Sequence, residues 1–136
     1  MADITVTAAN VRAYDGASTK VVTAATTVTA GQLVYMDTTD SNKYRPAESD
    51  AAAAAIIAGI ALTNSSDGDP LIIQNGGDVN PGGTVAVGQW YTASSNAGGI
   101  AVESDVASGN YPSLFGLGLT TSKIHMVISN TSTAHA

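Results

Sequence analysis

The sequence predicts an all-β fold: a small, glycine-rich β-barrel or sandwich built from two similar β-repeats, with at most one short helix. Apolar residues recur mostly in short alternating runs, which is the period of a half-buried strand. Gly, Asn and Asp cluster between these runs, and Gly and Asn accept the positive φ angles of tight turns. A set of short motifs also occurs twice in the same order.

The expected strands are short and are separated by turn signals such as Asp67-Gly68 and Asn75-Gly76-Gly77. Candidate strands lie at 21–22, 33–37, 57–62, 71–74, 84–87, 90–93, 114–119 and 124–129. The one helical candidate is residues 50–55, where Asp50 stands as an N-cap before a run of alanines. Such a short helix has to pack on the sheet to persist.

The internal repeat is the most informative feature. The stretch TVTAGQLVY at 27–35 returns as TVAVGQWY at 84–91, AESD at 47–50 as VESD at 102–105, and GIAL at 59–62 as GLGL at 116–119. These matches lie 57, 55 and 57 residues apart. Neither half can bury both faces of a sheet by itself, so the two halves should close on each other. We therefore expect repeats at about 27–77 and 84–129.

Residues 1–26 lie outside the repeat and are polar, rich in Thr and Ala, and weakly alternating. We expect this segment to be an extended N-terminal arm that needs another surface to order it, and residues 27–136 to form the β-domain. Deleting residues 2–20 is then expected to leave the domain folded. The apolar side chains of the arm are predicted to make the contacts with a partner: Ile4, Val6, Val11 and Tyr14.

The composition disfavours several classes of partner. Charged residues make up 12% of the chain, the net charge is −6, and the five basic residues are scattered. Nucleic-acid binding needs clustered cations, so no nucleic acid is expected, and an anionic membrane surface is disfavoured for the same reason. No stretch approaches the roughly 18 apolar residues of a membrane span. Without an apolar leader at the N-terminus, the expected place of synthesis and assembly is the cytoplasm.

The sequence offers no assembled reactive centre, so we expect a non-catalytic protein without a cofactor. The chain has no cysteine, and neither His125 nor His135 has a second metal ligand at suitable spacing. Glu48 and Glu103 stand at equivalent positions in the repeats. Paired carboxylates act in glycosidases, but that chemistry needs a cleft lined by aromatic and polar groups. Surface or capping roles are the preferred interpretation.

Calcium is an alternative that the sequence leaves open, although no resident metal is our prediction. Asp37, Asp40 and Asn42 offer one set of oxygen ligands, and Asp67 and Asp69 offer another. Neither set reaches the six or more ligands that Ca²⁺ prefers, nor matches the spacing of an EF-hand loop. Asp and Asn in β-loops more often form turns.

The few large aromatic residues are predicted to fill the core or an interface: Tyr35, Trp90, Tyr91 and Phe115. Trp90-Tyr91 aligns with Val34-Tyr35 in the repeat, so one member of each pair should point inward. The alternate member is then available for contacts, because aromatic side chains are favoured at interfaces.

One family resembles this chain over about residues 27–129. The matching motifs are AGQLVYMD at 30–37, KYRPA at 43–47, GIAL at 59–62, VNPGGT at 79–84, GQWY at 88–91, GGIA at 98–101 and FGLG at 115–118. In this order they resemble the decoration, or cement, proteins encoded among the head genes of tailed bacteriophages. Such a protein has no catalytic or metal motif to carry over.

The resemblance implies a structural virion protein with a β-rich fold. It implies binding to the outer surface of a mature capsid, with the major capsid protein as partner, and stabilisation of the shell by bridging capsomers. A homotrimer on the virion exterior is also implied. The alternative is a host- or carbohydrate-binding module on a virion or cell surface, with Tyr44 or Tyr111 as an exposed aromatic platform.

Overall fold

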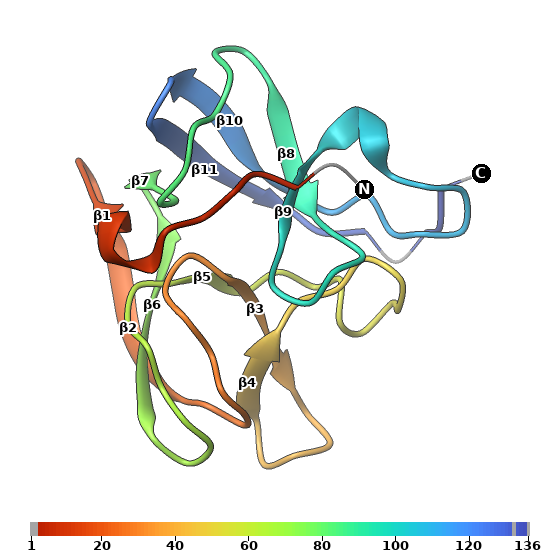
Figure 1. Ribbon diagram of the computed structural model, residues 1–136. Helices are drawn as coiled ribbons and strands as arrows, with labels where there is room; N and C mark the ends of the chain where they lie inside the picture. Colours follow the sequence, from red (N-terminus) through yellow and green to blue (C-terminus); the bar gives the residue numbers. More distant parts are fainter. Residues whose placement is uncertain (1–2, 132, 136) are drawn as a thin grey trace.

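The computed structural model describes residues 3–131 and 133–135, which form two antiparallel β-sheets packed face to face (Figure 1). The six-stranded sheet has the order β1-β7-β11-β10-β8-β9, and the five-stranded sheet has the order β2-β6-β5-β3-β4. The strands are β1 (Arg12–Ala13), β2 (Ser18–Thr23), β3 (Leu33–Asp37), β4 (Lys43–Pro46), β5 (Gly59–Ala61), β6 (Pro70–Gly76), β7 (Asp78–Asn80), β8 (Trp90–Ala93), β9 (Ile100–Val102), β10 (Leu114–Thr120) and β11 (Lys123–Ser129). The all-β prediction is confirmed.

Each sheet contains one copy of the repeat, and β1 is an additional edge strand of the six-stranded sheet. The order β2-β6-β5-β3-β4 corresponds strand by strand to β7-β11-β10-β8-β9. Val34 pairs with Gly59 in the first sheet and Tyr91 pairs with Gly116 in the second, so both partners shift by 57 positions (34 to 91, 59 to 116). The predicted duplication is therefore present in the strand register as well as in the sequence.

The Gly-Gln motif makes the same turn in both sheets. Gly31 has a φ of 92° and Gly88 a φ of 78°, a region that side chains with a Cβ rarely enter. The amide of Gly31 donates to the carbonyl oxygen of Ala61, and the amide of Gly88 donates to that of Gly118, at 2.8 Å in both cases. In both sheets the turn therefore directs the strand that follows it, β3 or β8, into the sheet.

Two of the predicted elements do not form. Residues 84–87 are not a strand, because the Val85 amide donates to Thr121 in a loop and the Ala86 amide donates to the Tyr91 hydroxyl. Residues 50–55 form one turn, in which Ala55 donates to Ala51, and no α-helix occurs within the described ranges. The helical residues of the described chain form two short 3-10 helices, η1 (Ala8–Asn10) and η2 (Glu103–Asp105).

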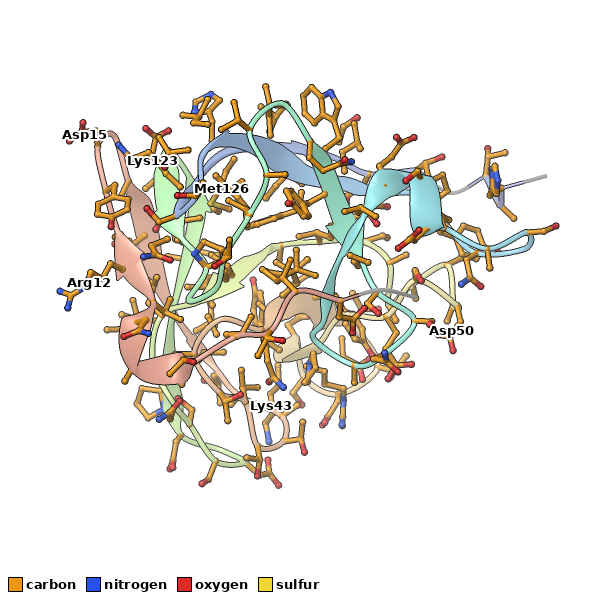
Figure 2. All side chains as sticks on the ribbon, turned by 45° about the horizontal axis from the view of Figure 1, so that its top comes forward. Arg12, Asp15, Lys43, Asp50, Lys123 and Met126 are labelled. Atoms are coloured by element: carbon orange, nitrogen blue, oxygen red, sulfur yellow. The ribbon has the colours of Figure 1, made fainter. Side chains whose placement is uncertain are left out.

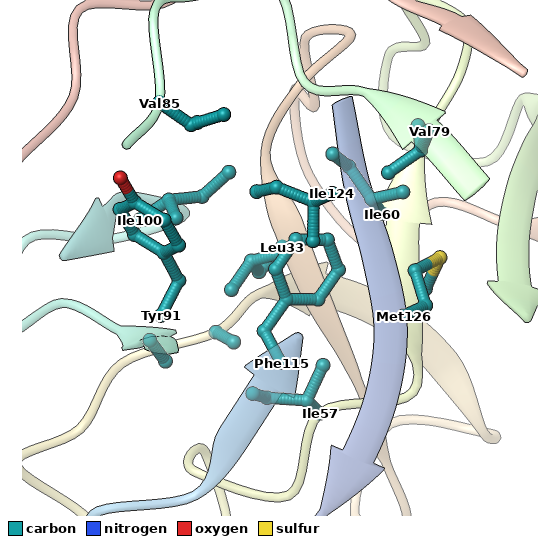
Figure 3. Packing of buried hydrophobic residues seen from close by; sticks show 12 residues of the cluster. Leu33, Ile57, Ile60, Val79, Val85, Tyr91, Ile100, Phe115, Ile124 and Met126 are labelled. Atoms are coloured by element: carbon teal, nitrogen blue, oxygen red, sulfur yellow. The ribbon is translucent and has the colours of Figure 1, made fainter. Parts of the chain in front are cut away.

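The main core lies between the sheets (Figure 3). Phe115 from β10 packs among buried residues that include Leu33 of the five-stranded sheet, Ile57 of the segment before β5 and Ile124 of the neighbouring strand β11. Burying each large apolar side chain contributes roughly 1.5–3 kcal/mol. The alternation predicted from the sequence thus places one face of each sheet in a shared interior.

A second, smaller core lies on the other face of the five-stranded sheet. The sheet curls until Ala24, just after β2, bridges Tyr44 on β4 at the opposite edge. This curl encloses a cluster of buried residues: Ala24, Val28, Val34, Tyr44, Ala61, Leu71 and Ile73. The first repeat therefore has barrel character of its own.

The N-terminal segment is held by the chain's own β-domain. β1 pairs with β7, and β2 pairs with β6 along its whole length. β2 thereby serves as the first strand of the five-stranded sheet, so the structural repeat begins within the segment that the sequence assigned to a separate arm. The surface that orders residues 3–26 is intramolecular, while Met1 and Ala2 lie outside the described residues.

Candidate interaction surface

Three of the four predicted contact residues face the interior of their own chain. Ile4 packs against the main core. A Cβ added at Gly82 would lie 3.1 Å from Val6 Cγ1 and 2.9 Å from Val11 Cγ2. The side chains of Val6 and Val11 therefore pack against the backbone of Gly82, in the space that a side chain at that position would fill. These three side chains are half-buried and already have contacts within their own chain; their predicted role in contacting a partner stays a prediction.

The second repeat makes room for this segment by using glycine. Asp3 bridges Ala101 on β9, and the amide of Thr7 donates to the carbonyl oxygen of Gly82 at 2.9 Å. The segment thus runs between β9 and the stretch after β7 (Figure 1). At the equivalent positions of the first repeat, 57 residues earlier, Gly82 and Gly83 are replaced by Ala25 and Thr26. There Ala25 donates directly to Tyr44, and no extra segment intervenes.

Tyr14 is the one predicted contact residue that lies on the surface. Tyr14 is 37% exposed. Its backbone amide donates a hydrogen bond to the Asp78 carbonyl oxygen at 2.9 Å. The ammonium of Lys123 lies 5.1 Å from the centre of the Tyr14 ring, a cation–π contact. Lys123 opens β11, so Tyr14 is fixed at one end of the six-stranded sheet.

The predicted aromatic residues divide between core and surface. Tyr91 and Phe115 are buried in the main core. Trp90 precedes Tyr91 on β8 and points to the opposite, partly exposed face of the six-stranded sheet. The register corrects the sequence alignment by one residue, since Tyr91 corresponds to Val34. Tyr35 is half-buried at the edge of the sandwich.

A row of paired residues crosses the outer face of the six-stranded sheet. Trp90 on β8 pairs with Leu117 on β10, Leu117 pairs with His125 on β11, and His125 pairs with Asp78 on β7. Cross-strand partners share a face, so these four side chains stand side by side. Two exposed apolar residues extend the same strands, Leu119 at 41% and Val127 at 40%. We call Tyr14, Trp90, Leu117, Leu119, His125 and Val127 the outer face.

The polar part of the outer face is a histidine–aspartate pair that the sequence analysis missed. His125 Nδ1 lies 2.8 Å from Asp78 Oδ1, although the residues are 47 positions apart. The His125 side chain is 51% exposed, on an open sheet surface. His125 stands between the buried Ile124 and Met126, so strand alternation turns it outward, and the pairing of β11 with β7 supplies its partner.

Two of the carboxylates considered as calcium ligands, Asp37 and Asp40, are engaged with other groups. Asp37 and Asp40 both accept hydrogen bonds from Arg45, at 2.9 and 2.6 Å. The hydrogen bonds from Thr39, followed by those from Arg45, lower the pKa of Asp37 below its ordinary value. Ser41 and Asn42 adopt positive φ angles in the turn between β3 and β4. Among the described residues, no group of three or more His, Asp or Glu side chains is arranged to hold a metal ion.

The remaining sequence candidates are dispersed. Glu48 follows β4 and lines a cavity described below, whereas Glu103 is exposed in η2. Tyr44, one of the two proposed aromatic platforms, is buried beneath Lys20, whose ammonium lies 5.5 Å from its ring centre. Tyr111 remains partly exposed. The labelled cations Arg12, Lys43 and Lys123 stand on separate parts of the molecule (Figure 2).

Comparison with known proteins adds no relative. The chain matches no protein-family model and no curated protein sequence. Within the described residues, no helix is both long and apolar enough to cross a membrane.

Proposed function

We propose that this chain is a decoration protein that binds the outer surface of a mature tailed-phage capsid and stabilises the shell by bridging capsomers. The observation that carries the proposal from the structure is the outer face, where a tryptophan and exposed aliphatic side chains share one side of a rigid sheet. The motif resemblance supplies the identity of the partner, the major capsid protein.

The outer face has the make-up of a protein contact surface. Trp90 and Leu117 form an apolar centre, and Leu119 and Val127 extend it. The His125–Asp78 pair and the Tyr14–Lys123 contact supply polar groups beside that centre. Protein interfaces commonly combine an apolar, aromatic centre with a polar rim. Strand pairing fixes these groups in advance, which reduces the entropy lost on binding.

The mechanism is thermodynamic linkage. A protein that binds the expanded shell, and not its precursor, stabilises the expanded form by mass action. Nanomolar affinity corresponds to about 12 kcal/mol per site, so contacts repeated over a shell resist the outward pressure of packaged DNA. A homotrimer, part of the proposal, would place three outer faces around one axis and engage several capsomers at once.

Cryo-electron microscopy of purified virions of the encoding phage tests the proposal. We expect density for the two-sheet domain on the outer shell, with the outer face toward the major capsid protein. Absence of the chain from purified particles overturns the proposal. Attachment through the five-stranded sheet instead overturns the assigned surface.

A binding assay with expanded capsids that lack the chain separates the surfaces further. Val127→Lys places a charge in the outer face and should weaken binding by at least about tenfold. Val21→Lys is the matched control, because Val21 is a 69% exposed valine on β2 of the other sheet. Equal binding by both variants contradicts the assignment of the outer face.

A further inference from the structure

A polar cavity of about 570 Å³ opens at the edge of the sandwich beside β3 and β4. Tyr35 and Arg45 line it as directly opposed partners of the two strands, so their side chains lie on the same face. Glu48 and Gln32 line the cavity as well, and alanines from the 50–55 turn contribute apolar surface. The volume falls within the roughly 300–1,000 Å³ that small-molecule sites occupy.

The charges around the cavity disfavour an anionic ligand. The Arg45 guanidinium already donates to Asp37 at 2.9 Å and to Asp40 at 2.6 Å. These two carboxylates hold Arg45 in place and offset its charge, and Glu48 adds a third carboxyl. Burial, followed by the nearby Asp50 carboxylate, raises the pKa of Glu48. An added anion would therefore meet net negative charge.

The hydrogen-bonding groups suit hydroxyls. Arg45 offers donors, Glu48 offers acceptors, and the Gln32 amide offers both. A vicinal diol presents groups that donate and accept at neighbouring positions, which matches this mixture. The half-buried Tyr35 ring presents an aromatic surface to the same space, against which the C–H groups of a pyranose can pack.

From this placement we infer that the cavity between Tyr35, Arg45 and Glu48 is a binding site for a neutral saccharide. The site is separate from the outer face: β3 and β4 belong to the five-stranded sheet, whereas Trp90, Leu117 and His125 belong to the six-stranded sheet. A chain attached to a partner through the outer face therefore keeps this cavity free. The inference does not depend on the proposed function, and either can fail alone.

Nuclear magnetic resonance of the ¹⁵N-labelled full chain tests the site. The probes are the methyl glycosides of glucose, galactose, mannose and N-acetylglucosamine, with methyl glucuronide as the anionic counterpart of the glucoside. We expect at least one neutral glycoside to shift the amides of residues 32–37 and 45–48 with a Kd on the order of 1 mM. Methyl glucuronide should bind more weakly than methyl glucoside.

Matched variants assign the effect to the cavity. Glu48→Gln should weaken binding of the glycoside that shifts these amides by about tenfold, while the spectrum of the variant remains that of a folded protein. Glu103→Gln, at the equivalent and exposed position of the second repeat, should leave the Kd unchanged. The inference is overturned if no neutral glycoside in the panel binds, if the shifts map elsewhere, if only the glucuronide binds, or if both variants behave alike.

Discussion

The hydroxyl of Tyr91 accepts a hydrogen bond from the backbone amide of Ala86 at 2.8 Å. Tyr91 is only 2% exposed and belongs to the main core, so one side chain both fills the interior and fastens the loop that precedes β8. Figure 3 shows its hydroxyl directed toward Val85 at the margin of the cluster. The equivalent residue of the first repeat is Val34, which has no hydroxyl to perform this second role.

Tyr91→Phe tests the contribution of this bond. The ring stays in place while the Ala86 amide loses its partner, so we expect the free energy of unfolding to fall by about 0.5–1.5 kcal/mol. Urea denaturation followed by Trp90 fluorescence measures the change. Tyr14→Phe, on the surface, should stay within about 0.5 kcal/mol of the parent protein. Equal losses in the two variants contradict the role assigned to the hydroxyl.

Gly83→Ala tests whether glycine makes room for the N-terminal segment. A Cβ at this position would collide with the Thr5 carbonyl oxygen, so the segment has to move. We expect a loss of about 1–3 kcal/mol in the free energy of unfolding. In a protein that lacks residues 2–10, the same substitution should cost less than about 0.5 kcal/mol, because the obstacle is absent.

The deletion of residues 2–10 has an expected effect of its own. It removes Ile4 from the main core and the Thr7–Gly82 hydrogen bond, so it should lower stability in urea denaturation. The sequence-based expectation was that the domain stays folded without residues 2–20, and complete unfolding of the shortened protein would contradict it. A substitution cost at Gly83 that is unchanged by the deletion would show that the clash is not with this segment.

Glu48→Gln tests the effect of pH on stability. Burial first, and Asp50 second, raise the pKa of Glu48 above its ordinary value of 4.5. The folded state therefore binds the Glu48 proton more tightly than the unfolded state does. This difference contributes fully to the free energy of unfolding below pH 4.5, and the contribution is lost as the pH rises through the raised pKa. Glutamine cannot ionise, so the variant does not lose this stability. The Tm of Glu48→Gln should therefore rise relative to that of the parent protein as the pH increases through this window.

The matched control for the pH experiment is Glu103→Gln, which removes one carboxylate from the exposed η2. Its Tm should follow that of the parent protein at every pH in a series of thermal melts. A Tm difference between Glu48→Gln and the parent that does not change with pH would contradict the burial of the Glu48 carboxyl.

Much of the fold follows from local signals. The strands at 33–37 and 90–93 coincide with β3 and β8, because a short run of apolar and aromatic residues follows a glycine turn in both places. The short strands β4, β7 and β9 were harder to foresee. Each has only three or four residues, too few for a clear period, and depends on its neighbours for hydrogen bonds.

The sequence by itself determined the β class, the duplication and the placement of the Gly-Gln turns, because these depend on period and on residues such as Gly31 and Gly88 that set the backbone locally. Only the tertiary structure decided where the N-terminal segment lies and which side chains share the outer face. Those outcomes depend on strand register, which brings His125 to Asp78 across 47 residues and seats Val6 beside Gly82. No local pattern encodes which distant strand a segment will pair with.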